Sequence, residues 1–254
     1  MDMEGILITN QGIEDVAALE IKELIGSKPT KGNGCVKFKI EEMVDLCKLS
    51  YLSQSASRII FLMSDFKFTD LMGDAKKKID KLNFDEWLDK KTGISVRCIK
   101  TDYESDSTAE IEKKFGEFIL DNIKSRKGNK QKVNLKNPDI VFMVFIAGNH
   151  CYFGIDFSGF DLSKRQYKIF LHPASLKGPI GYSLVRLSGF KKNEVLLDPF
   201  VGSGVILIEA ALHAINFPVN YYSKDKFAFL KLKPLGKLDF GKFFNEIDSN
   251  ILDE

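Results

Sequence analysis

The chain has 254 residues, of which 44% are hydrophobic and 28% are charged. Its 37 Lys and Arg and 35 Asp and Glu give a net charge of +2, so any basic surface must come from local clustering of basic residues. Its four cysteines form no CxxC pair, which argues against a metal site or a disulfide framework and favours reduced thiols. The N-terminus lacks the basic and apolar regions of a secretion signal, and no stretch approaches the roughly 20 apolar residues that cross a bilayer. We therefore expect a soluble cytoplasmic protein.

Short strands and helices alternate at the N-terminus. Residues 5–9, 35–40 and 57–63 are predicted as strands, and residues 12–25 and 41–49 as helices. The first helix has an apolar face and acids in its first turn, where the helix dipole favours them. This order predicts a small α+β sheet covered on one face, followed by a helical connection over 65–92 that contains Trp87.

A second small α/β unit follows. Residues 94–99 alternate like a half-buried strand, and residues 107–123 are predicted as a helix. Ser107 as N-cap, with Glu110 three residues on, has the spacing of a capping box. Two further strands, 140–146 and 151–156, are joined by a Gly-Asn turn that predicts a hairpin. Residues 179–189 form a helical pattern after it.

A strand, a glycine-rich turn and an apolar helix are predicted in turn over residues 195–212. The apolar run 195–197 predicts a strand, which leads to Asp198 and then to a turn with Gly202 and Gly204 and an apolar helix. Glycines let the backbone approach a ligand closely, and the first amides of the helix offer donors to a negative group. An acceptor and donors together suit an amino-acid zwitterion. No Walker sequence is present, and Leu207 replaces the third glycine of a dinucleotide fingerprint. The alternative is an ordinary strand–turn–helix of a buried α/β core.

The stretch 198–212, DPFVGSGVILIEAAL, resembles motif I of S-adenosylmethionine-dependent methyltransferases, in the form used by the THUMP-domain RNA methyltransferases. The segments LHPASLK (171–177) and SLVRLSG (183–189) are similar to that family's lead-in, a His-Pro-Ala turn and a helix before the first strand. NPDI, GID and LSKRQY, between residues 137 and 167, look like the end of a THUMP domain and its exit into the catalytic domain.

The resemblance implies S-adenosylmethionine as cofactor and methyl transfer to a guanine exocyclic amine in tRNA. It also implies which residues line the cofactor pocket: Asp198, Phe200, Gly202, Ser203 and Gly204. Asp198 would meet the ammonium of the methionine moiety. His172, in the His-Pro-Ala turn, is a candidate for the rim of this pocket, whereas His150 and His213 are interpreted as structural or surface residues.

Two features of the family are absent from the sequence. Family members continue to an acidic residue that holds the ribose hydroxyls, and later to an Asn- or Asp-Pro-Pro-aromatic catalytic loop. This chain has seven prolines and no Pro-Pro pair, and no second apolar strand follows residue 212. We therefore expect an N-terminal part of a methyltransferase that is inactive alone and needs its missing C-terminal part, for which a separate C-terminal half, encoded by a split gene, is one source. A permuted DNA aminomethyltransferase would carry its Pro-Pro loop upstream of the turn, and no such loop is found there.

Two long stretches, 122–137 and 162–193, contain basic residues and no acid. They are either solvated loops and helix ends or an RNA-binding face, and a THUMP domain beside them favours RNA. The predicted RNA contacts are Lys127, Lys130, Lys132, Lys164 and Arg165.

Two more features allow two interpretations each. Glu209 either pairs with a base or orients the glycine turn, the second being slightly favoured. The aromatic residues after position 220 form either an apolar face that awaits the rest of a domain, which is favoured, or a base-stacking platform.

The sequence thus predicts an α/β protein in three parts. These are a ferredoxin-like unit with its connector (1–90), a THUMP domain (91–160), and a linker with the first part of a Rossmann-like methyltransferase domain (161–254). The function predicted is guanine-N2 methylation of tRNA. The alternative is a stand-alone THUMP-type RNA-binding module with a vestigial enzyme portion.

Overall fold

The computed structural model of the chain describes residues 3–128, 130–169 and 175–252. Its helices and strands gather into two compact units, each built from separate stretches of the chain. Unit 1 comprises Met1–Ile59, Phe160–Phe227 and Leu238–Glu254, and unit 2 comprises Ile60–Gly159 and Ala228–Lys237. The mixture of helices and strands confirms the predicted α/β class.

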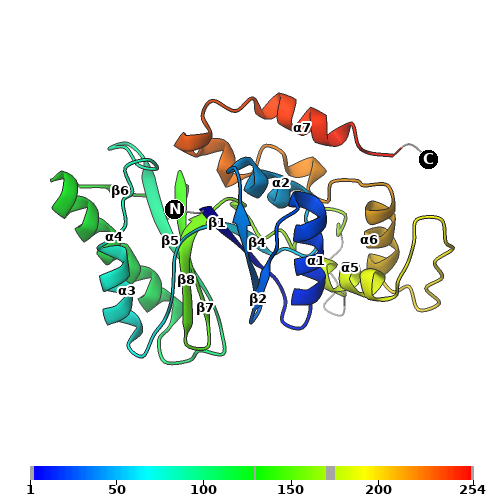
Figure 1. The fold of residues 1–254 in the computed structure, drawn as a ribbon, viewed down its shortest axis with the longest axis horizontal. Helices are drawn as coiled ribbons and strands as arrows, with labels where there is room; N and C mark the ends of the chain where they lie inside the picture. Colours follow the sequence, from blue (N-terminus) through cyan, green and yellow to red (C-terminus); the bar gives the residue numbers. More distant parts are fainter. Residues whose placement is uncertain (1–2, 129, 170–174, 253–254) are drawn as a thin grey trace. The chain divides into compact units, whose positions relative to one another are not determined.

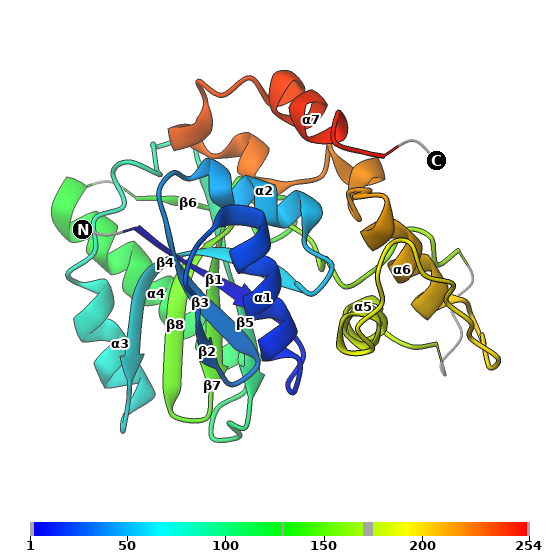
Figure 2. The same cartoon turned by 45° about the vertical axis from the view of Figure 1, so that its right-hand side comes forward.

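The N-terminal part of unit 1 is a small antiparallel sheet with two helices. Its strands are β1 (Met3–Ile8), β2 (Thr30–Gly32) and β3 (Cys35–Ile40), in the order β2-β3-β1, and its helices are α1 (Glu14–Ile25) and α2 (Val44–Leu52). Figure 2 shows α1 and α2 beside these strands. α1 ends where Gly26 adopts a left-handed conformation with φ of 71°, which glycine tolerates without steric cost.

The later stretches of unit 1 are helical. α5 (Gly178–Leu187) and α6 (Val205–Ala214) pack against each other, and a 3-10 turn (Tyr221–Ser223) and α7 (Phe240–Asp248) follow. Pro179 lies in the first turn of α5, where its missing N–H is not needed. Asp239 is the N-cap of α7, and its carboxylate accepts a hydrogen bond from the Lys242 amide at 3.0 Å.

Unit 2 contains five consecutive strands of the sheet and two helices. The strand order is β4 (Arg58–Lys67), β8 (His150–Asp156), β7 (Ile140–Ala147), β5 (Gly93–Thr101) and β6 (Lys132–Val133). β7 pairs antiparallel with β8 and parallel with β5. Figure 1 shows α3 (Leu71–Ile79) and α4 (Thr108–Lys127) together on one flank of these strands. Two short 3-10 turns, Ala228–Lys231 and Lys233–Leu235, complete the unit.

Several local predictions in unit 2 are confirmed. The Ser107 hydroxyl accepts a hydrogen bond from the Glu110 amide at 3.2 Å, and the Glu110 carboxylate accepts one from the Ser107 amide at 2.9 Å, so the capping box is complete. The β7–β8 hairpin turns at Gly148, whose φ is 57°. The predicted helical connection over 65–92 is only partly helical, because within it α-helix is confined to α3.

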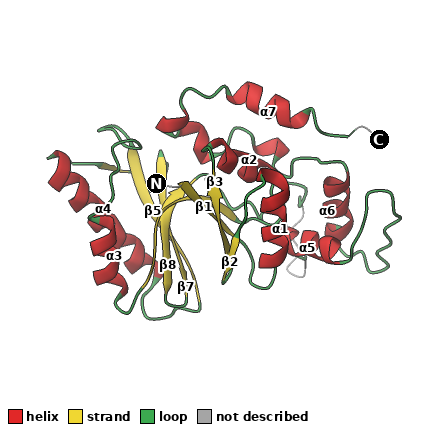
Figure 3. Ribbon diagram, viewed as in Figure 1, coloured by secondary structure: helices red, strands yellow, loops and turns green. Residues whose placement is uncertain are grey.

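The strand predicted at 195–197 is not formed. Figure 3 draws the whole connection between α5 and α6 as loop, and the structure assigns these three residues no strand. Val195 and Leu197 are 99% and 82% exposed. The physical reason is that a strand needs a neighbour for its backbone hydrogen bonds, and within the described ranges no strand pairs with this segment.

The interpretation of the aromatic tail as an uncovered apolar face is also wrong. Phe227, Phe243 and Phe244 are buried within unit 1. The Tyr51 ring of α2 meets the rings of Phe244 and Phe227 edge-on, with centroids 4.9 and 6.2 Å apart. The tail therefore covers the N-terminal part of its own unit.

Two general expectations concern compartment and redox state. All four cysteines are free thiols. No helix among the described residues is long and apolar enough to span a membrane.

Candidate functional site

The glycine turn leads directly into α6. Gly202 and Gly204 have φ of 53° and 73°, a region that favours glycine, so the turn needs these residues as predicted. The Gly204 amide donates to the Val201 carbonyl at 2.8 Å, and the Ser203 hydroxyl lies 2.9 Å from the Ser175 hydroxyl. Because the first amides of a helix have no partner inside it, this end of α6 can receive a negatively charged group.

Asp198 and Phe200 lie just before this turn. The Asp198 carboxylate is partly exposed and accepts a hydrogen bond from the Phe200 amide at 3.0 Å. The Phe200 side chain is 92% exposed. The five predicted cofactor residues thus lie on one continuous segment. A carboxylate, two glycines at positive φ and a helix N-terminus fit part of a zwitterion site, and the exposed Phe200 side chain leaves that site open.

Glu209, in the middle of the apolar helix α6, is fully buried together with Arg165. Arg165 Nε donates to Glu209 Oε1 at 2.7 Å, and Arg165 Nη2 lies 3.3 Å from Oε2. The Tyr167 hydroxyl donates to Oε1 at 2.7 Å, and Gln54 Nε2 donates to Oε2 at 2.7 Å. Burial raises the pKa of Tyr167, and the nearby Glu209 carboxylate raises it further, so this hydroxyl stays a donor.

This network settles how two predicted residues are placed. Glu209 pairs with a base, Arg165, as one of the two interpretations predicted; its orientation of the glycine turn stays a prediction. Arg165 was predicted to contact RNA, but the structure corrects this: its guanidinium is enclosed, and its other donors go to the carbonyls of Leu162 and Gln54. A buried cation of this kind cannot reach a phosphate in solution.

The other predicted RNA contacts are lysines with different surroundings. Lys130, Lys132 and Lys164 are exposed. Lys127 Nζ pairs with an Asp85 carboxylate oxygen at 2.6 Å, and this hydrogen bond lowers the pKa of Asp85. Lys130 and Lys132 flank the start of the edge strand β6 of unit 2, whereas Lys164 belongs to unit 1.

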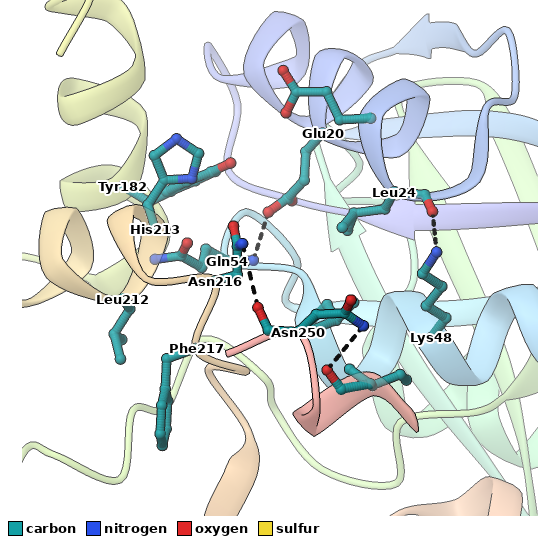
Figure 4. Close-up of a pocket in the computed structure, with 13 residues that line it drawn as sticks. Glu20, Leu24, Lys48, Gln54, Tyr182, Leu212, His213, Asn216, Phe217 and Asn250 are labelled. Atoms are coloured by element: carbon teal, nitrogen blue, oxygen red, sulfur yellow. Dashed lines mark hydrogen bonds between the residues drawn. The ribbon is translucent and has the colours of Figure 1, made fainter. Parts of the chain in front are cut away.

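A cavity of about 440 Å³ lies in unit 1 near the C-terminal end of α6, away from the glycine turn. Figure 4 shows Tyr182 and His213 on one side of it, with Gln54 and Glu20 near its centre. The Glu20 carboxylate accepts from the Ser53 hydroxyl at 2.6 Å and the Gln54 amide at 2.8 Å. Burial lowers the pKa of His213, and the Arg186 charge lowers it further. The rings of Tyr182 and His213 meet edge-on at 5.6 Å, which supports the structural interpretation of His213.

The sequence left several members of the buried network unnamed. Gln54, Tyr167 and two α5 glycines, Gly178 and Gly181, all lie against Glu209 or Arg165. The available signal was a lone carboxylate inside an apolar helix, since such a group must find hydrogen-bond donors when buried. The His-Pro-Ala turn and His172 lie outside the described residues. Among the residues described, no group of three or more His, Cys, Asp or Glu is placed to hold a metal ion.

Comparison with protein families gives two matches. Residues 72–156 match a family described as the THUMP domain, and residues 165–239 match one described as the RMKL-like methyltransferase domain. The first match begins before the predicted boundary at 91, and the division into 1–90, 91–160 and 161–254 stays a prediction.

Two archaeal relatives share a name. The tRNA (guanine(6)-N2)-methyltransferase of Methanocaldococcus jannaschii is 29% identical over 251 residues, which are 98% of this chain and 66% of that protein. The protein of the same name from Archaeoglobus fulgidus is 29% identical over 82% of this chain and 53% of its own length. The chain therefore spans between about half and two thirds of these relatives.

Two solved structures show the same fold. A protein of Clostridium difficile 630, described as a possible methylase, has a TM-score of 0.84 at 22% identity and covers 100% of this chain and 66% of its own. SMU.472, solved in complex with SAH, has a TM-score of 0.80 at 20% identity over 99% of this chain and 66% of its own.

Proposed function

We propose that the chain, which matches a THUMP-domain family and an RMKL-like methyltransferase-domain family, serves S-adenosylmethionine-dependent methylation of the N2 amine of a guanine in tRNA. The observation that carries this proposal is the glycine turn at the N-terminus of α6, inside the segment that matches the methyltransferase family. The names of the two archaeal relatives support guanine N2 as the target. The two domain matches confirm the resemblance to proteins with a THUMP domain and a methyltransferase domain.

Each residue of the glycine turn has a proposed task. Asp198 accepts hydrogen bonds from the ammonium of the methionine moiety, and the first amides of α6 receive its carboxylate. Gly202 and Gly204 let the backbone come close, and Ser203 and Phe200 border the pocket. The cofactor supplies an electrophilic methyl group on sulfur. The protein's part in this segment is to bind and orient that group.

The exposed lysines are proposed to hold the tRNA backbone. Lys130 and Lys132 lie in an acid-free stretch of the THUMP match, and Lys164 lies on the segment just after it. Lys127 contributes less, because Asp85 already neutralises it. Arg165 is not part of this surface.

The exposed segment 195–197 is proposed to become the first strand of a parallel sheet when further methyltransferase strands are present. Val195 and Leu197 are 99% and 82% exposed, which is unfavourable for apolar side chains in water. A separate C-terminal half is one source of such strands, and a continuous polypeptide is another. The same exposure also favours the second candidate, an RNA-binding module that transfers no methyl group.

Methyl incorporation from tritiated S-adenosylmethionine into tRNA tests the proposal. We expect no transfer by residues 1–254 alone, and transfer once the remaining methyltransferase strands are supplied. Asp198→Ala should then lower activity at limiting cofactor, because losing a charged hydrogen-bond partner costs roughly 1.5–3 kcal/mol. Asp198→Asn should lower it less, since the amide keeps an acceptor. Full activity of Asp198→Ala would show that the turn is scaffold, and tRNA binding without transfer in the completed protein would favour the RNA-binding module.

A further inference from the structure

The Glu209 network joins α6 to two other stretches of unit 1. Its carboxylate is reached by donors from Gln54, Arg165 and Tyr167, which lie 155, 44 and 42 residues away in sequence. We call Glu209 with these three residues the anchor. Every one of these bonds fixes the position and rotation of α6, because each requires the carboxylate to face its donor at a set distance.

Stability alone does not account for a charge pair at this place. Replacing a buried ion pair by apolar residues of similar volume is often neutral or stabilising, because the desolvation of two charges is no longer needed. The rest of α6 between Val205 and Leu212 is apolar, so an apolar residue at 209 would suit the helix. A charged pair in this position therefore points to a geometric role.

Two glycines of α5 bring that helix close to the same face of α6. A Cβ on Gly181 would lie 2.7 Å from Val205 Cγ1 and 3.7 Å from Glu209 Cγ, and a Cβ on Gly178 would lie 2.8 Å from Glu209 Oε1. Val205 and Glu209 are four residues apart and share one helix face. The α5 glycines thus extend the anchor to the first residue of α6, which directly follows Gly204.

The glycine turn itself has little else to hold it. Among the described residues, its hydrogen bonds are local or few: the Gly204 amide to the Val201 carbonyl, the Ile208 amide to the Gly204 carbonyl, the Phe200 amide to the Asp198 carboxylate, and the Ser203 hydroxyl with the Ser175 hydroxyl. The preceding residues 195–201 are largely exposed. Because Glu209 lies only about 6 Å along the helix axis from Val205, the orientation of the turn follows the anchor.

We propose that Glu209 and Arg165 are positioning residues for cofactor binding, which act with Gly181 to aim the glycine turn and the first amides of α6. The inference rests on the proposed function for the identity of the cofactor, but the position of the turn is measurable without it. None of these three residues touches the cofactor. They act through α6, so their loss displaces the binding groups and lowers affinity without removing any of those groups.

Gly181→Ala is the sharpest test, because it adds one methyl group against Val205 and leaves the anchor's charges intact. Alanine is also the better helix former by about 1 kcal/mol, so weakened binding would not come from a weakened α5. We expect the amide NMR signals of Gly202 and Gly204 to move, and the affinity for S-adenosylmethionine, titrated by NMR into the chain, to fall about tenfold. Gly181→Ala/Val205→Ala removes the clash and should restore both. Gly116→Ala in α4 is the matched control, since its Cβ would lie 3.8 Å from Val96 Cγ2, an ordinary contact.

The paired variant Arg165→Met/Glu209→Leu tests the anchor itself. It removes both charges together and so leaves no buried charge unpaired. We expect a folded chain with the same displacement of the glycine signals and a similar loss of affinity. Unmoved signals and unchanged affinity in both Gly181→Ala and the paired variant would overturn the inference. If the unaltered chain gives no cofactor-dependent shifts, the cofactor assignment fails, and the glycine signals of the variants still decide the positioning role.

Discussion

Phe244→Ala should destabilise unit 1 by about 3 kcal/mol, the lower end of the range for truncating a buried phenylalanine. Phe244 is 7% exposed, and its ring centroid lies 4.9 Å from that of Tyr51 and 5.1 Å from that of Phe243. Losing the ring removes apolar burial and leaves a cavity beside α2. It also removes an edge-on aromatic pair, worth about 0.5–1.5 kcal/mol beyond its area.

Urea unfolding followed by far-UV circular dichroism measures this loss, and hydrogen exchange in α2 and α7 locates it. Fluorescence of the chain's single tryptophan, Trp87, reports on unit 2 instead. Tyr222→Ala is the matched control, because Tyr222 lies in the same tail and is 73% exposed. Its effect should stay within about 0.5 kcal/mol, as is usual for surface substitutions.

A Phe244→Ala loss as small as that of Tyr222→Ala would refute this reasoning. It would mean that the tail does not cover α2 in solution and that its phenylalanines await another partner, the interpretation first drawn from the sequence.

Three further predictions concern other parts of the chain. Burial, and then the Arg186 charge, hold the pKa of His213 below its usual 6.5, so the stability that the neutral ring contributes is present above that pH and is lost as the pH falls through the lowered pKa. His213→Gln should therefore flatten the fall in melting temperature on acidification, and an unchanged slope would contradict the lowered pKa. Ser107→Ala should destabilise α4 by about 1 kcal/mol in urea unfolding, because it removes one arm of the capping box, and a change near zero would show that Glu110 alone caps the helix. Lys130→Glu/Lys132→Glu should weaken tRNA binding and reduce the slope of log affinity against log salt by about 0.7–0.9 per lost phosphate contact. The control pair Lys76→Glu/Lys77→Glu on α3 should leave that slope unchanged, and equal slopes in both pairs would mean that the RNA-binding face lies elsewhere.

The parts of the fold that the sequence predicted well are governed by local chemistry. The capping box at Ser107, the β7–β8 hairpin and the positive φ of Gly202 and Gly204 depend on residues close in sequence. The strand at 195–197 failed because strand formation depends on a neighbouring strand, which no local pattern reveals. The tail failed for a similar reason, since the partner of Phe244 is Tyr51, almost two hundred residues earlier.

In the candidate site, too, the features that depend on residues close in sequence could be predicted, and those that depend on distant partners could not. The cofactor segment was readable because its glycines, its carboxylate and its helix start are contiguous. Arg165 was misplaced because a run of basic residues says nothing of which side chains turn inward. The exposure of its neighbours Lys164 and Gln166, alternating with the inward Arg165 and Tyr167, is visible only in three dimensions.

The two ends of the cofactor segment differ in how they are held, and this difference bears on how activity would arise. The middle of α6 is fixed by a buried carboxylate with charged and neutral donors, whereas the segment before the glycine turn lies in solvent. Pairing of 195–197 with another strand would fix the position of Asp198, while α6 keeps its place. The first amides of α6 are therefore in position before the Asp198 carboxylate is. A chain in this state should bind S-adenosylmethionine weakly, through α6 alone, and gain affinity when a neighbouring strand fixes Asp198. The gain in affinity for S-adenosylmethionine when the neighbouring strand is added should therefore be large in the unaltered protein. It should be small in Asp198→Ala, which lacks the carboxylate that the new strand would position.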